Sequence, residues 1–119
     1  MRIHQFDIWT INLNPSKGSE QREIRPCVIL QTNAVNHISR TLIIAPLTSK
    51  KLEKIFPFEV KILKDKLNKL DQDSKIKIEQ TRVISTERLV SKIGSLEEKY
   101  HDKIFTAIKI IFDFNKDFI

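Results

Sequence analysis

Residues 6–13 read FDIWTINL, a largely apolar run with the length of one β-strand. Two further runs of this kind follow at residues 26–31 and 42–46, and both are rich in aliphatic side chains. Runs that stay apolar at successive positions are typical of strands covered on both faces. We therefore expect these three segments to form the centre of a sheet or barrel.

Two later segments alternate in polarity. Every second residue is apolar in 56–62, beginning with Phe56, and the same pattern surrounds Ile76 and Ile78. A period of two predicts strands with one face in solvent, which for the second segment places Lys75 and Lys77 on the wet face.

The last element is predicted to be a helix. Residues 95–98, Ser-Leu-Glu-Glu, match the capping-box pattern, and apolar residues recur at helical spacing from Tyr100 to Ile111. Phe105 and Phe112 widen the apolar stripe, which leaves surface for a partner. Several short strands followed by one helix predict a mainly β fold, a small antiparallel barrel with a C-terminal helix packed on it.

The 119 residues fit a single domain, 1–119, without repeats or a Gly/Ser-rich linker. No stretch has the apolar character of a signal peptide or of a membrane-spanning helix, so we expect a soluble, cytoplasmic chain. Cys27 is the only cysteine, which excludes an internal disulfide and a cysteine-based zinc site, and its apolar neighbours predict a core position.

The net charge of +6 suits an anionic partner such as nucleic acid or an acidic protein tail. Residues 50–77 hold most of the excess, with nine Lys/Arg against five Asp/Glu. Lysine is abundant on a solvated surface too, so basicity alone does not separate RNA binding from plain solubility.

The usual parts of a nuclease are scarce. The three histidines fall at a strand edge, in a loop and on the helix, and do not suggest a paired acid and base. The close carboxylates Asp71 and Asp73 are flanked by lysines and predict a solvated turn, not a metal site. No Gly-rich phosphate loop or Gly-x-Ser-x-Gly elbow is present.

The polar segment 14–26 delivers Arg22 and Arg25 to the start of a central strand. A guanidinium presents a planar fork of donors that matches a phosphate, and Pro26 fixes the direction of the chain just after it. The alternative is a surface salt bridge to Glu20 or Glu23.

Four separated blocks of this sequence resemble the MazF/PemK family, the ribonuclease halves of bacterial toxin–antitoxin pairs. In order along nearly the whole chain they are residues 6–15, residues 18–26, Ala45-Pro46-Leu47-Thr48-Ser49, and residues 78–94 with Ile78-Glu79-Gln80-Thr81-Arg82 at their start. The resemblance implies an SH3-like, PemK/CcdB-like barrel with a C-terminal helix. It also implies a homodimer that holds single-stranded RNA near the subunit boundary, uses no metal or other cofactor, and is held by a MazE-like antitoxin with an acidic, disordered tail. Such toxins inhibit translation and arrest growth, and bind DNA with their antitoxin in autoregulation.

The resemblance further implies a catalytic pair, Arg25 and Thr48. The RNA's own 2′-hydroxyl attacks the adjacent phosphate, leaving a 2′,3′-cyclic phosphate and a 5′-hydroxyl. Arg25 would stabilise the developing charge and Thr48 would donate its hydroxyl, while the proton could move through Arg25 or water. The expected surrounding RNA-binding residues are Ser19, Gln21, Arg22, Asn36, Gln80 and Arg82. We also expect the loop 16–23 to change conformation about Gly18 between free, RNA-bound and antitoxin-bound states.

Two positions depart from the family pattern, in which glycine commonly stands where this chain has Phe6 and Glu23. The first is expected to repack the strand, and the second to place a carboxylate near Arg25 that alters activity or RNA preference. Two alternatives keep the same fold without catalysis: a protein that poisons DNA gyrase, and a plain RNA-binding module.

Overall fold

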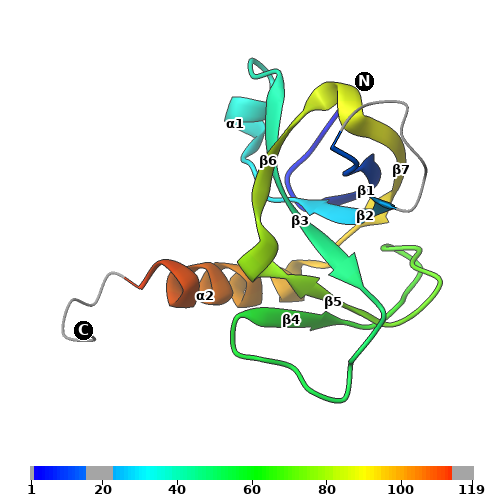
Figure 1. The fold of residues 1–119 in the computed structure, drawn as a ribbon, viewed down its shortest axis with the longest axis vertical. Coiled ribbons are helices and arrows are strands. Elements are labelled where there is room, and N and C mark those ends of the chain that lie inside the picture. The colour runs from blue at the N-terminus through cyan, green and yellow to red at the C-terminus, as the bar shows by residue number, and fades with distance from the viewer. Residues whose placement is uncertain (1, 16–22, 114–119) are drawn as a thin grey trace.

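The computed structural model describes residues 2–15 and 23–113. In chain order its elements are β1 (Asp7–Asn12), β2 (Ile24–Ile29), α1 (Asn33–Asn36), β3 (Thr41–Thr48), β4 (Glu59–Ile62), β5 (Ser74–Lys77), the 3-10 turn η2 (Ile78–Gln80), β6 (Arg82–Ser85), η3 (Thr86–Arg88), β7 (Leu89–Ser95), η4 (Glu98–Tyr100) and α2 (His101–Phe112). The mainly β architecture with a C-terminal helix is as predicted (Figure 1).

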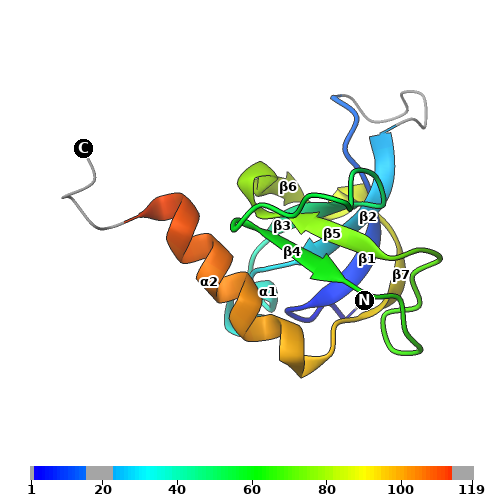
Figure 2. The same cartoon turned by 90° about the horizontal axis from the view of Figure 1, so that it is seen from below.

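The described strands form one antiparallel sheet in the order β4-β5-β3-β2-β1-β7, with β6 also paired to β3. The long strand β3 pairs with β6 through residues 41–44 and with β5 through Leu47 and Thr48, so it joins the two halves of the sheet. No pairing joins β4 to β7 in the part of the chain that the structure describes, so the expected barrel is a curved, open sheet. Helix α2 crosses one side of this sheet and packs against β4 and η2 (Figure 2).

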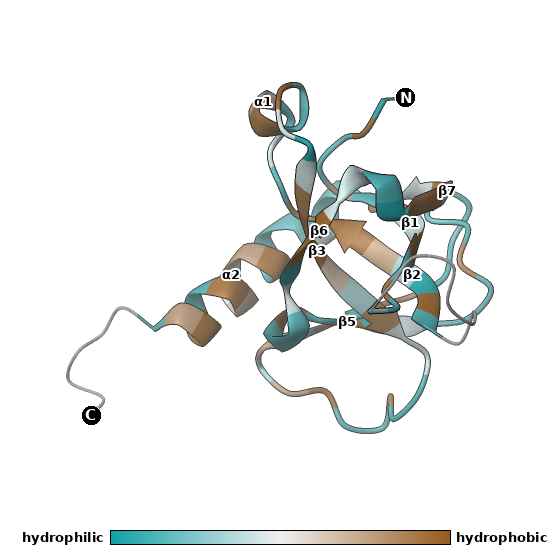
Figure 3. Cartoon of the chain, turned by 45° about the horizontal axis from the view of Figure 1, so that its top comes forward, coloured by the Kyte–Doolittle hydropathy of each residue, from teal (hydrophilic) through white to brown (hydrophobic). Residues whose placement is uncertain are grey.

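The core has two parts that share the central strands. Val28 and Leu30 belong to a cluster completed by α2, while Cys27 and Ile29 belong to a second cluster with Trp9. Because neighbouring residues of β2 enter opposite clusters, this strand is covered on both faces, as its apolar run predicted. Figure 3 shows apolar segments in the central strands and apolar segments alternating with polar ones along α2. The buried position of Cys27 is confirmed.

Several predicted boundaries are wrong. Strand β4 begins only at Glu59, so Phe56 and Phe58 precede it in a loop, and Ile78 starts a 3-10 turn. The capping box does not form: Ser95 ends β7 and its hydroxyl donates to Asp7, while α2 begins at His101 without a side-chain cap. The long-range bond to Asp7 has displaced the local one that the Ser-Leu-Glu-Glu pattern favoured. No helix in the described ranges is long and apolar enough to cross a membrane.

Candidate active site

Arg25 and Thr48 line one open pocket of about 280 Å³. The other residues around it come from β2, from the end of β3 and the two residues after it, and from the loop that leads into β5: they are Pro26, Leu47, Ser49, Lys50, Leu70, Asp71, Gln72 and Ser74. The pocket therefore lies where the two halves of the sheet meet.

Strand register explains why these two residues meet. In the antiparallel pair of β2 and β3, Cys27 is opposite Pro46. Arg25 lies two residues before Cys27 and Thr48 lies two residues after Pro46, so both residues follow the last β2–β3 pair at the same end of these strands. Residues two apart in a strand share a face. The apolar runs that place β2 beside β3 thus also assemble the site.

The Thr48 side chain has a defined orientation. Its Oγ1 accepts a hydrogen bond of 3.2 Å from the backbone N–H of Lys50, and its backbone is paired with Lys75 of β5. Since this bond uses the oxygen as an acceptor, the hydroxyl hydrogen remains available as a donor. The half-buried Thr48 can therefore donate to an anion in the pocket.

Two arginines affect the pKa of the buried Cys27 thiol. Burial raises the pKa of Cys27 from 9.0 to about 12, and the positive charges of Arg25 and then Arg82 oppose this rise. Both positive charges therefore favour the ionised thiolate, but burial has the larger effect. The thiol itself stays protonated and has no nucleophilic role.

The sequence also allowed a salt bridge from Arg25 to Glu20 or Glu23, and of these two carboxylates only Glu23 lies in the described ranges. Among the described residues no ion pair joins Arg25 to Glu23, whose side chain is exposed. Glu20 lies outside the described ranges, as do Ser19, Gln21, Arg22 and the expected pivot Gly18.

The remaining predicted RNA-binding residues separate into two groups. Gln80 ends η2 and Arg82 begins β6 opposite Ile44, and both side chains are exposed. Asn36 instead lies in α1, where its amide exchanges hydrogen bonds with Gln31 near the start of β3. Thr48 ends that strand, about 20 Å away at the rise of a β-strand. The structure therefore does not bring Asn36 to the pocket within one chain.

Arg88 has a structural role that its place in the fourth sequence block did not reveal. Its guanidinium donates to the carbonyl oxygens of Asn12 at 3.1 Å, of Asn14, and of Pro15 at 3.3 Å. Three carbonyls on one guanidinium fix the chain where it leaves β1 for residues 16–22. Its partners lie more than 70 residues away, so spacing gave no signal of the contact.

Lys75 is buried, against the prediction of a wet face. Its ammonium donates at 3.1 Å to the carbonyls of Lys51 and Lys54 and at 3.0 Å to Glu59. Burial raises the pKa of Glu59, but hydrogen bonds from Phe56 N–H, Lys75 and Lys77 outweigh that effect and lower it below 4.5. This ionised pair holds the segment between β3 and β4, whose first residues form one wall of the pocket.

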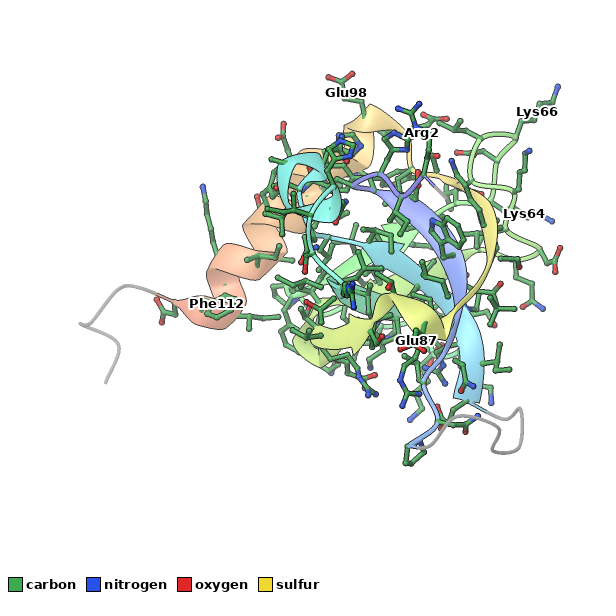
Figure 4. The ribbon with its side chains drawn as sticks, turned by 90° about the horizontal axis from the view of Figure 1, so that it is seen from above. Arg2, Lys64, Lys66, Glu87, Glu98 and Phe112 are labelled. Carbon is green, nitrogen blue, oxygen red and sulfur yellow. The ribbon has the colours of Figure 1, made fainter. Side chains whose placement is uncertain are left out.

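The carboxylates considered for a metal site have separate environments. Asp73 accepts a hydrogen bond from Lys64 N–H at 2.9 Å, whereas Asp71 lines the pocket. The described residues contain no group of three or more His, Cys, Asp or Glu side chains placed to hold a metal ion. On the same loop Lys64 and Lys66 point away from the domain (Figure 4).

A model of one protein family, the PemK-like, MazF-like toxins of type II toxin–antitoxin systems, matches residues 4–112. The chain belongs to this toxin family. Endoribonuclease MazF of Staphylococcus saprophyticus is 39% identical over 108 residues, covering 91% of this chain and 89% of the relative. The toxin MazF-mt6 of Mycobacterium tuberculosis superposes with a TM-score of 0.74 at 25% identity, covering 90% of this chain and 96% of that one. A mycobacterial endoribonuclease solved with its cognate antitoxin has a TM-score of 0.75 at 15% identity, covering 93% and 95%, and supports the fold alone.

Phe6 stands before the first-strand Asp7, at a position where the resemblance leads us to expect glycine, and its backbone conformation explains that expectation. Phe6 has a φ of 70°, in the left-handed region that favours glycine. Its ring is nevertheless buried, stacked on His101 with the ring centroids 3.8 Å apart and edge-on to Phe105. The backbone of this MazF-like chain is therefore strained at Phe6, and the Phe6 ring packs on α2 just before β1 begins. Glu23, at the second departure, has no positive φ and keeps an exposed side chain.

Proposed function

We propose that this MazF-like toxin cleaves single-stranded RNA at the Arg25–Thr48 pocket, without a metal ion. The RNA's 2′-hydroxyl attacks the adjacent phosphorus, the bond to the 5′-oxygen breaks, and the products carry a 2′,3′-cyclic phosphate and a 5′-hydroxyl. The observation that carries this proposal is the meeting of Arg25 and Thr48 in one pocket through the register of β2 and β3.

The chemistry of the two side chains supports distinct roles. A guanidinium keeps its charge at neutral pH, since its pKa exceeds about 12, and so suits the negative charge that develops on a phosphorane. The Thr48 hydroxyl, oriented by the Lys50 N–H, would donate to a non-bridging phosphate oxygen. Arg82 and Gln80 would contact the RNA beyond the pocket, and the proton passes through Arg25 or water.

The biological setting follows from the family. The chain is an endoribonuclease toxin of a type II toxin–antitoxin module, as its Staphylococcus saprophyticus relative is named. We propose that it acts as a single-domain homodimer in the cytoplasm and is neutralised by a cognate antitoxin, the kind of partner present in the mycobacterial complex. The net charge of +6 supports both an RNA substrate and an acidic antitoxin segment.

The mechanism is tested with an RNA that carries one 2′-deoxy residue at the cleaved position, located first by sequencing the products. We expect binding without cleavage, because the attacking hydroxyl is missing, and a cyclic phosphate on the cut all-ribose control. Equal cleavage of both RNAs would contradict the proposed attack. An RNA-binding module would cut neither, and a gyrase poison would bind neither.

A further inference from the structure

The segment that leaves the pocket toward β4 carries a pair of stacked aromatic rings, of which Phe56 is exposed and Phe58 is half-buried. Phe56 and Phe58 stack with centroids 5.3 Å apart and planes only 3° from parallel. Lys54 places its ammonium 4.9 Å from the Phe56 centroid, and Phe56 is 41% exposed. We name these three residues the aromatic step.

The aromatic step is held in place by buried charges. Phe56 N–H donates to Glu59 Oε1 at 3.0 Å, the same oxygen that accepts from Lys75. Lys75 also binds the carbonyls of Lys51 and Lys54, so one ammonium fixes the backbone on both sides of residues 52 and 53. The backbone that carries the aromatic step is therefore held before any ligand arrives, which lowers the entropic cost of binding.

The surroundings of the aromatic step select the chemistry of its ligand. Residues 49–58 carry three lysines and one glutamate, and the segment starts at Ser49 and Lys50, which line the pocket. An apolar protein partner would match the rings but not the lysines, and an acidic peptide segment would match the lysines but not a flat aromatic face, whereas a nucleobase with its phosphate matches both. Aromatic side chains beside basic residues are the common means of binding single-stranded nucleic acid.

We propose that the aromatic step binds one unpaired base of the RNA outside the scissile step, with Phe56 stacking on the base. Lys54 moves from the ring to the neighbouring phosphate when the base arrives. This inference rests on the proposed function and adds a binding subsite to it, one that raises affinity and leaves the reacting atoms untouched.

The test compares Phe56→Leu, Phe56→Tyr and the same-loop control Ile55→Ala, which truncates an exposed apolar neighbour but leaves the ring. Phe56→Leu keeps apolar bulk and removes the aromatic face, and we expect it to raise KM roughly tenfold at unchanged kcat. Phe56→Tyr restores the wild-type KM, and Ile55→Ala leaves it unchanged. Circular dichroism verifies that each variant is folded.

Stacking is read directly with RNAs that carry a 2′-deoxy residue at the cleaved position and one 2-aminopurine, moved along the chain. We expect wild-type protein and Phe56→Tyr to quench the fluorescence at one position outside the scissile step, and Phe56→Leu to abolish that quenching. Equal KM and equal quenching for wild type and Phe56→Leu overturn the inference. So does a Phe56→Leu protein that binds RNA normally but loses the antitoxin. A wild-type protein that neither binds nor cuts RNA contradicts the proposed function instead, which keeps the two failures distinct.

Discussion

Phe6 shows how one side chain can override a local backbone preference. A left-handed φ costs a residue with a Cβ about 1–2 kcal/mol, yet the ring is buried between β1 and α2. Removing a buried phenylalanine costs about 3–5 kcal/mol. Packing therefore exceeds strain, which explains why a phenylalanine is tolerated where the family commonly has glycine.

This balance predicts an inverted order of stability at position 6. Both Phe6→Ala and Phe6→Gly should lose the ring contacts, but only the alanine keeps the strained φ. We expect Phe6→Gly to be the more stable of the two by about 1 kcal/mol, whereas glycine in an ordinary strand is the less stable. Urea denaturation measures the difference. An alanine variant at least as stable as the glycine variant would refute the account of the strain.

Gly94 illustrates a different requirement for glycine, the close approach of two chain segments. A Cβ at this position would lie 2.5 Å from the carbonyl oxygen of Leu67 and 2.6 Å from that of Asn68. Asn68 is fully buried and its amide organises the loop by bonding Leu63 O and the backbone N–H groups of Asp65 and Leu70. The loop cannot yield without breaking these bonds.

We therefore expect Gly94→Ala to destabilise the protein by about 1–3 kcal/mol, the usual cost of overpacking. The matched control is Ser91→Ala, an exposed position on the same strand. Thermal or urea unfolding of both variants measures the effect. If the two substitutions were equally harmless, the close packing of β7 against the loop would be absent in solution.

At the scale of elements, the central strands were predictable and the edges were not. Strands β1, β2 and β3 are apolar at successive positions because both of their faces are buried, so composition identifies them. Strands β6 and β7 were not predicted, because in each of them exposed apolar residues such as Val83 and Val90 mix with polar ones. These two strands are instead stabilised by pairing with β3 and β1, which the local sequence does not reveal. Lys75 was misread because alternation assigns its side chain to solvent, while its actual partners are distant in sequence.

The pair of Glu59 and Lys75 predicts how stability depends on pH. The pKa of Glu59 is lowered below 4.5 in the folded chain, so its contribution to the free energy of unfolding is complete above pH 4.5 and is lost as pH falls through the folded pKa. Glu59→Gln should cost about 3–5 kcal/mol at pH 7, since it leaves the buried Lys75 without its counter-charge. The gap between variant and wild type should narrow below pH 4.5. Urea titrations at several pH values test this, and a gap independent of pH would contradict it.

At the scale of the whole molecule, the topology brings residues from separated sequence blocks to one pocket. The resemblance indicated Arg25 and Thr48, and both line one pocket just beyond the last pair of β2 and β3. The roles of Arg88, which holds the end of β1, and of Lys75, which holds the segment after β3, could not be inferred because their carbonyl partners belong to other elements. Sequence patterns carry local periodicity and motif identity, whereas these contacts depend on the completed fold.

The most direct measurement is the single-turnover rate of RNA cleavage, in excess chelator, by wild type, Arg25→Ala, Thr48→Val and the control Arg40→Ala. Arg40 is exposed and immediately precedes β3, at the end opposite Thr48. We expect full activity for wild type and the control, and a loss of roughly 10²–10³ in rate for each of the other two, because each removes one donor to the developing charge. Cleavage that stops in chelator, or Arg25→Ala and Thr48→Val proteins that cut at the wild-type rate, would contradict the central claim.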